Sequence, residues 1–171
     1  MPRGFTLLEL LITIAVLSVL LTAAAPSFQN VFETNKMQRL ANELHGFVIQ
    51  GKSEAVLRRE RLWAHLIMSG GSSSDGNWRI ELTDNSSEGV GTVLFSFSGA
   101  PYKGIVVTPS YASDQISFDD VHGRPSSGNI RFYPVGESSK ALKLISHTLS
   151  ARVRVCSDNN NTEFFGYSTC S

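Results

Sequence analysis

The hydrophobic positions of this chain change their spacing twice. Residues 5–25 are almost uniformly apolar, and Glu9 is the only ionisable side chain among them. Beyond them, apolar residues recur at helical spacing among charged ones, which predicts an amphipathic helix that continues the first segment. We therefore expect one helix from Phe5 to about Arg59. Its second half should bury a single stripe against a folded domain.

From Trp63 onward the spacing becomes that of short strands separated by turn-rich stretches. The segments that fit are WAHLIM, NWRIEL, TVLFSF, GIVVT, QISF, NIRFY, ALKLISH and ARVRVC. About eight strands in so short a region favour packed antiparallel sheets over a parallel α/β arrangement. The predicted fold class is α+β: a long N-terminal α-helix, transmembrane in its first half, followed by an antiparallel β-sandwich-like domain.

The first apolar segment is long enough to cross a membrane, because about 20 helical residues span about 30 Å. The basic start at Arg3 would stay in the cytoplasm, and the rest of the chain would lie outside. A cleaved secretory signal is the alternative, with a cleavage site near Ala25. However, the run is longer than the usual signal core of about 7–15 residues. It also contains Glu9, and an acid at such a depth usually marks a pairing function, so we expect Glu9 to meet a cation.

The stretch Gly4-Phe5-Thr6-Leu7-Leu8-Glu9-Leu10 resembles the type IV prepilin, or class III, signal of type IV pilins and type II secretion pseudopilins. The resemblance implies that a prepilin peptidase cuts after Gly4 and N-methylates Phe5. It also implies that Glu9 meets the terminal amine of an adjacent subunit during assembly. The implied parts are a leader peptide (1–4), a transmembrane and assembly segment (5–25), an amphipathic helical half (26–61) and a periplasmic β domain (62–171).

A second resemblance, to the GspH/FimT family, rests on RLANELHGFVIQGKSEAVLRRERLW, ISFDDVHGRPSSGNIRFYP and LKLISHTLSARVRVC. Members of this family include minor pseudopilins of type II secretion and minor pilins of type IV pili. The resemblance implies a type IV pilin-like fold and a low-copy subunit whose partners are other major or minor pilins or pseudopilins. It further implies a single-pass inner-membrane protein with a periplasmic C-terminal domain, which is later incorporated into a pilus or pseudopilus.

Composition and cysteine placement narrow the chemistry. The net charge of the 171 residues is zero, so no overall field draws the chain to nucleic acid. Cys156 and Cys170 both lie beyond the apolar segment, where an oxidising periplasm favours a disulfide that closes the C-terminal loop. The chain shows no nucleophile elbow, nucleotide-binding glycine loop or metal-ligand spacing, and Asp119-Asp120 reads as a turn. We therefore expect no enzyme activity, no cofactor and no metal.

The stretch Ala151-Arg152-Val153-Arg154 raises the possibility of DNA binding. Strand alternation puts Arg152 and Arg154 on one face, where two guanidinium groups can hold successive phosphates. The FimT branch of the family binds DNA during uptake through a Gly-Arg-x-Arg motif, and the resemblance places these two arginines on it, with Ala151 in place of the glycine. The alternative is an ordinary solvated sheet face.

Other residues could enlarge such a surface. Phe164, Phe165 and Tyr167 could stack on bases, or they could form the small core of their own loop. Four cations could extend a basic patch if they fold onto the same side: Arg124, Arg131, Lys140 and Lys143. A further arginine cluster where the helix should end fits either the helix dipole or a phosphate or partner site: Arg58, Arg59 and Arg61.

Three functions therefore remain open. A structural filament subunit, such as type II secretion pseudopilin H without DNA binding, requires processing at Gly4 and depends on Glu9. A DNA-binding subunit of a type IV pilus additionally depends on Arg152 and Arg154. A soluble exported protein or hydrolase would instead be cleaved near Ala25.

Overall fold

The computed structural model describes residues 5–159 and 161–170, and the side chains of these residues except 23–29. The chain forms two compact units, Met1–Asn35 and Lys36–Ser171, and the boundary between them lies inside the long helix. The expected leader peptide, with its cleavage position at Gly4, lies outside the described residues.

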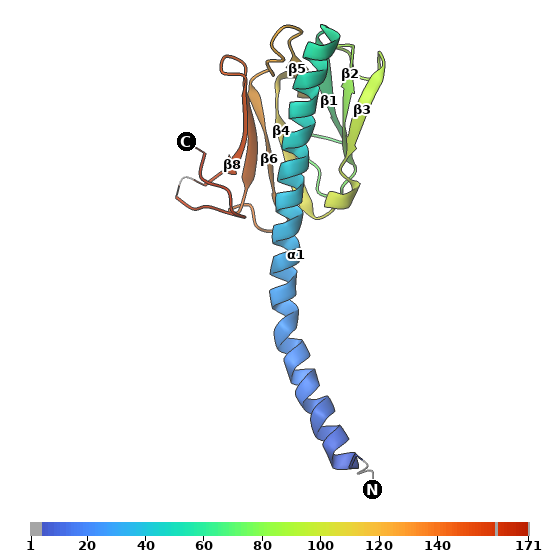
Figure 1. Ribbon diagram of the computed structural model, residues 1–171, viewed down its shortest axis with the longest axis vertical. Helices are drawn as coiled ribbons and strands as arrows, with labels where there is room; N and C mark the ends of the chain where they lie inside the picture. Colours follow the sequence, from blue (N-terminus) through green and yellow to red (C-terminus); the bar gives the residue numbers. More distant parts are fainter. Residues whose placement is uncertain (1–4, 160, 171) are drawn as a thin grey trace. The chain divides into compact units, whose positions relative to one another are not determined.

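Helix α1 spans Leu7–Arg58, close to the predicted Phe5–Arg59 (Figure 1). Within the second unit the helix buries one stripe, as its amphipathic spacing predicts: Met37, Leu40, Ala41, Leu44, Phe47, Val48 and Ala55. Gly51 belongs to this stripe, and a Cβ at this position would lie 2.9 Å from the ring of Phe118. The missing side chain therefore lets the helix approach the sheet closely.

The first unit is helical and exposed. All described side chains of residues 5–22 are open to solvent, including many large apolar ones. Among the described residues, no helix is long and apolar enough to cross a membrane, which differs from the span expected over residues 5–25.

The end of α1 is a Schellman motif. The N–H of Arg59 donates to the carbonyl of Val56 at 3.3 Å, and the N–H of Glu60 donates to the carbonyl of Ala55 at 3.2 Å. Arg59 adopts a φ of 55°, the left-handed conformation that this motif requires. Arg58 stays in the last helical turn and pairs with the Glu54 carboxylate at 2.6 Å. These contacts favour the helix-ending interpretation of Arg58 and Arg59.

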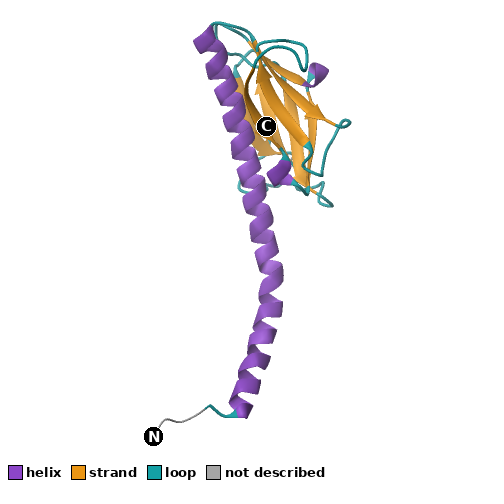
Figure 2. Ribbon diagram, turned by 90° about the vertical axis from the view of Figure 1, so that its right-hand side faces the viewer, coloured by secondary structure: helices purple, strands orange, loops and turns teal. Residues whose placement is uncertain are grey.

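Two four-stranded antiparallel sheets follow the helix (Figures 1 and 2). The first sheet has the order β3-β2-β1-β5 and the second has the order β4-β6-β7-β8. Their bounds are β1 Leu62–Met68, β2 Trp78–Thr83, β3 Val93–Ser98, β4 Ile105–Ser110, β5 Gln115–Phe118, β6 Gly128–Pro134, β7 Leu142–His147 and β8 Arg152–Ser157. Two short 3-10 helices, η1 (Ala100–Tyr102) and η2 (Ala112–Asp114), flank β4. All eight predicted strands are therefore confirmed.

The two sheets and residues 36–58 of α1 share one hydrophobic core, to which every strand contributes alternate side chains. Two polar groups within this core satisfy each other. The hydroxyl of Tyr111 lies 2.9 Å from that of Ser146, which donates to the carbonyl of Ser126 at 2.6 Å. Burial raises the pKa of Tyr111 to about 12, against the opposing effect of the Ser146 hydrogen bond. Tyr111 is therefore a neutral structural residue.

Candidate functional site

The N-terminal motif lies at the exposed start of α1. Phe5 is 76% exposed, and Glu9 is exposed in the first turn of the helix. No described residue forms an ion pair with Glu9. Gly4 lies outside the described residues, so the cleavage position has no structural description. The carboxylate of Glu9 is thus open to a cation supplied from elsewhere.

The start of the helix carries a cap that was not predicted from the sequence. The N–H of Glu9 donates to the hydroxyl of Thr6 at 3.2 Å, so Thr6 acts as the N-cap of the helix. A threonine at the N-cap and a glutamate at the third helical position are the two residues of a capping box. This Thr-x-x-Glu spacing is visible in the sequence. The observed cap uses the backbone N–H of Glu9 and leaves its carboxylate for pairing with another chain.

The few polar side chains of the exposed helical segment are satisfied locally. The hydroxyls of Thr13, Ser18 and Thr22 each donate at 2.8 Å to a backbone carbonyl three or four residues earlier. Such hydroxyls make no demand on an outside partner. Apart from Glu9 and the short hydroxyl side chains, the surface of residues 5–22 is apolar, and exposed apolar surfaces of this extent mark contacts with protein or lipid.

The second candidate site is the outer face of the second sheet, where β8 is an edge strand. Arg152 is exposed and Arg154 is half-buried, while Val153 and Val155 pack against the core. The predicted separation of the arginines from the valines is thus confirmed. Ala151 has a φ of 52°, a conformation that favours glycine. The alanine therefore holds the backbone conformation that would suit the glycine of the Gly-Arg-x-Arg motif.

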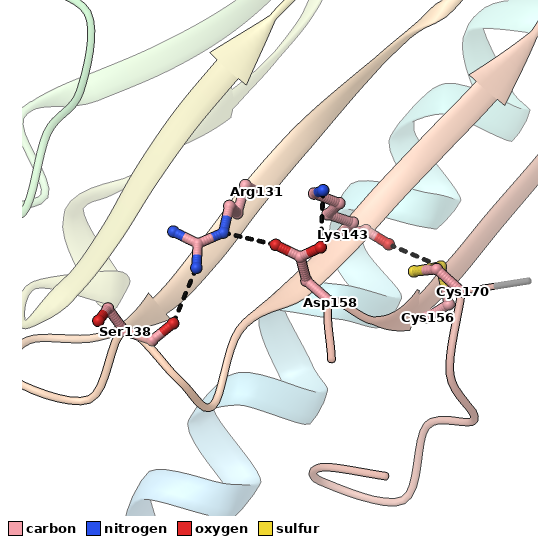
Figure 3. A network of polar contacts seen from close by, with 6 residues as sticks. All are labelled: Arg131, Ser138, Lys143, Cys156, Asp158 and Cys170. Carbon is pink, nitrogen blue, oxygen red and sulfur yellow. Dashed lines mark hydrogen bonds and ion pairs between the residues drawn. A yellow bond between two sulfur atoms is a disulfide. The ribbon is translucent and has the colours of Figure 1, made fainter. Parts of the chain in front are cut away.

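A carboxylate neutralises the neighbouring cations on this face (Figure 3). Asp158 accepts from the Arg131 Nε at 2.7 Å and pairs with the Lys143 Nζ at 2.6 Å. Arg131 also donates to the carbonyl of Ser138 at 2.8 Å. Burial alone would raise the pKa of Asp158, but the hydrogen bonds from Lys143 and Arg131 outweigh it and hold the pKa below its usual value. Asp158 is therefore ionised over most of the pH range.

The basic patch is consequently smaller than the one considered in the sequence analysis, to which four further cations could have contributed. Arg131 and Lys143 do share the outer face, but both are held by Asp158, and Lys140 pairs with Glu137 at 2.7 Å. Arg152 and Arg154 lie on the same face, on β8.

The Asp158 network gives a pH-dependent prediction. Because its pKa is lower in the folded state, the network stabilises the fold above about pH 4 and loses its effect as the pH falls further. Asp158→Asn should lower the free energy of unfolding by about 1–2 kcal/mol at neutral pH, since charge-assisted hydrogen bonds are lost. The difference from the unmodified protein should shrink at about pH 3. Urea unfolding of residues 36–171 at neutral pH and at about pH 3 measures this difference in the free energy of unfolding. If the difference were the same at both pH values, ionised Asp158 would not be the source of the stability.

The C-terminal loop is closed by the expected disulfide. Cys156 and Cys170 are bonded, with their Cα atoms 5.1 Å apart, so the predicted pairing is confirmed. The aromatic residues of the loop, Phe164, Phe165 and Tyr167, are partly buried against the core.

Two hydrogen bonds also tie this loop to α1. Gln38 donates to the carbonyl of Phe165 at 2.9 Å, and the hydroxyl of Tyr167 donates to Asn42 at 3.0 Å. The loop aromatics thus serve packing, and the structure does not favour the alternative that they stack on bases.

The structure also places the residues considered for catalysis. Asp119 accepts hydrogen bonds from the backbone N–H groups of Val121, His122 and Arg124, which confirms the turn interpretation. These bonds, the one from His122 foremost, hold its pKa below the usual value against the effect of burial. The described part of the chain contains no group of three or more His, Cys, Asp or Glu residues that could hold a metal ion.

Comparisons with known proteins agree with this architecture. The prokaryotic N-terminal methylation motif matches residues 2–25, and the family of the type II transport protein GspH matches residues 40–163. Two fimbrial proteins of Pseudomonas aeruginosa are 28% identical over 126 residues, which cover 67% of this chain and 82% of each relative.

Two crystal structures of the type IV minor pilin FimU of Pseudomonas aeruginosa PAO1 are similar in fold. The first has a TM-score of 0.59 at 16% identity and covers 72% of this chain and 90% of FimU. The second has a TM-score of 0.54 at 14% identity, with coverages of 69% and 90%. The likeness confirms the expected type IV pilin-like α+β fold.

Proposed function

This chain belongs to the family of the type II transport protein GspH, and from that membership we propose that it works as a minor subunit of a type IV pilus or of a type II secretion pseudopilus. It is a minor pilin- or pseudopilin-like protein, and its family and fold are those of structural proteins. The observation that carries the proposal is the methylation motif followed by a helical segment that exposes apolar side chains on all sides.

The proposed mechanism is assembly. A prepilin peptidase cuts after Gly4 and leaves Phe5 with a methylated amine. Residues 5–25 anchor the subunit in the inner membrane, with residues 62–171 in the periplasm, until Glu9 pairs with the terminal amine of a neighbouring subunit. The subunit then leaves the lipid, and other pilins or pseudopilins cover its apolar helix. Packing between helices holds it in the filament.

The mass of the mature chain tests the processing step. The proposal requires a first residue of Phe5 that carries one methyl group. Cleavage near Ala25 would instead indicate a soluble exported protein and overturn the assembly proposal.

Binding of DNA through Arg152 and Arg154 is a second candidate function. It is supported by two neighbouring arginines on one face of an edge strand and by the glycine-like backbone of Ala151. The carboxylate of Asp158 argues against DNA binding, because it neutralises the charge of the adjacent Arg131 and Lys143. A purely structural role, as in type II secretion pseudopilin H, is the alternative.

A salt titration of DNA binding by residues 29–171 separates these roles. If the arginines neutralise phosphates, affinity should fall as salt rises, and Arg152→Ala/Arg154→Ala should reduce the logarithmic slope by about 2. Asp158→Asn should strengthen binding, because it releases two cations on the same face. Arg59→Ala/Arg61→Ala is the matched control, since it removes equal charge at the end of α1, and it should leave the slope unchanged.

Each outcome assigns a role. If both double variants lose the same DNA affinity and the same salt slope, DNA is attracted nonspecifically to any cation of the chain. No binding at low salt would leave the structural role alone.

A further inference from the structure

Strand β3 is a sheet edge that is open over residues 95–98. It lies at the outer side of the first sheet, with β2 on one side and no strand on the other (Figure 1). Its sequence, Val-Leu-Phe-Ser-Phe-Ser, contains no charge and no proline. A bulge, which is itself a feature that discourages pairing, lies at the Leu82/Thr83 register shift near the start of β3, and residues 95–98 pair with β2 in regular register. Uncharged, apolar edges of this kind readily pair with another chain.

The other three sheet edges carry features that discourage such pairing. Strand β4 contains Pro109, and Ser73 bridges to its edge. Strand β5 is short and bridges to Pro125. Strand β8 carries exposed charge at Arg152, and Thr169 covers its last residue. The contrast indicates that the open edge of β3 is a specific feature of this fold.

The backbone groups at this edge point outward. The N–H of Gly99 donates to the carbonyl of Trp78 at 2.8 Å, so these residues form a hydrogen-bonded pair next to β2. Such pairs alternate along an antiparallel ladder, and Phe97 is therefore the next residue bonded to β2. By the same alternation, the backbone N–H and C=O groups of Ser96 and Ser98 face away from β2. The hydroxyl of Ser98 accepts from the N–H of Ala100 at 3.3 Å, which leaves the backbone groups of Ser98 available. Water satisfies these accessible groups in the isolated subunit, and an added strand would replace that water with a row of backbone hydrogen bonds.

A groove of about 370 Å³ runs beside this edge, between α1 and β3. One side of it is aromatic: Phe47 and Phe95 pack edge to face with centroids 5.0 Å apart, and Phe97 lies beside them. The rest of its lining is polar apart from Gly46: Glu43, Gln50 and Ser96. On the helix side, Gly46 has no side chain, and no atom lies within 4 Å of where its Cβ would be. The groove therefore has space for an apolar side chain that projects from an added strand.

We infer that β3 receives an extended, uncharged segment of a neighbouring filament subunit, which adds a strand to the first sheet and seats an apolar side chain over Gly46. This inference rests on the proposed filament function. Backbone pairing would provide the affinity, and the aromatic side of the groove would select the residue that faces it. The contact would hold the β domain to a neighbour independently of the helical contacts.

Hydrogen exchange in the unmodified full chain tests the inference directly. We expect the amides of Ser96 and Ser98 to exchange about tenfold or more slowly in isolated filaments than in the detergent-extracted subunit. The amide of Phe97 is the internal reference, because it is bonded to β2 in both forms. Equal rates at Ser96 and Ser98 in both forms would overturn the inference.

Edge-blocking variants give an independent test in cells. Ser96→Lys should reduce the fraction of the chain recovered in sheared filaments by about tenfold, since an edge lysine opposes strand addition. Ser110→Lys is the matched control, because it makes the same change at the already protected edge of β4, and its recovery should be unchanged. Trypsin resistance of the extracted chain with its disulfide intact shows that each variant is folded.

The outcomes separate this inference from the proposed function. Normal recovery of the Ser96→Lys chain, together with loss of the Glu9→Ala chain, would reject strand addition and retain the filament role. Normal recovery of the Glu9→Ala chain would reject the proposed assembly mechanism itself.

Discussion

Replacement of Glu9 by alanine should nearly abolish recovery of the chain in filaments. In the proposed assembly, the change leaves a terminal ammonium unpaired among apolar helices. Loss of one partner of a buried pair costs about 3–5 kcal/mol, which corresponds to a loss of about a hundredfold or more. Glu9→Gln should behave alike, because it keeps the shape and removes the charge. Comparison of sheared filaments with the membrane fraction measures the effect.

The Thr6 cap supplies the control for this prediction. Thr6→Ala removes the hydroxyl that accepts the N–H of Glu9 and should cost about 1 kcal/mol of helix stability. Its effect on assembly should therefore be modest, provided that the mature chain still begins at Phe5. A loss in Thr6→Ala as large as that in Glu9→Gln would mean that helix initiation limits assembly, because Glu9→Gln keeps both the backbone N–H and a side chain able to cap the helix. Normal assembly of Glu9→Gln would contradict the pairing mechanism.

Removal of the disulfide should have the second large effect. Cys156→Ala/Cys170→Ala should lower the free energy of unfolding of residues 36–171 by about 3 kcal/mol, because the bond restricts a loop of about fifteen residues in the unfolded chain. Urea unfolding of the oxidised protein and the double variant measures the difference.

The reduced, unmodified domain is the control for this measurement. It should resemble the double variant, because it lacks the same covalent restraint. A loss below about 1 kcal/mol would contradict the prediction, since it would mean that the bond adds little to the contacts already made by the loop. In that case the hydrogen bonds from Gln38 and Tyr167 would be the main attachments.

The helix and the strands could be predicted from the sequence because local residue patterns determine them. The helix follows from its buried stripe, and each strand follows from alternation between turns, so α1 and all eight strands agree with prediction. The disulfide follows from two cysteines in a domain that the sequence predicts to be periplasmic. The strand alternation likewise placed Arg152 and Arg154 on a common face.

Features that depend on contacts between residues far apart in the sequence could not be predicted. The sequence could not show that Asp158 holds Arg131 and Lys143, because these residues lie on β6 and β7. Nor could it decide whether Phe165 and its neighbours stack on a ligand or pack on α1, because their partners lie far away in the chain. The open edge of β3 was hidden for the same reason, since an edge is defined only once all neighbours are known.

The order of the strands has a consequence for how the domain folds. Strand β5 completes the first sheet by pairing Phe118 with Leu62, although β4, which precedes it in the chain, belongs to the second sheet. The first sheet therefore closes only after the chain has entered and left the second, and both sheets share the core with α1. We expect residues 36–171 to unfold in a single cooperative transition, without a stable intermediate that retains one sheet.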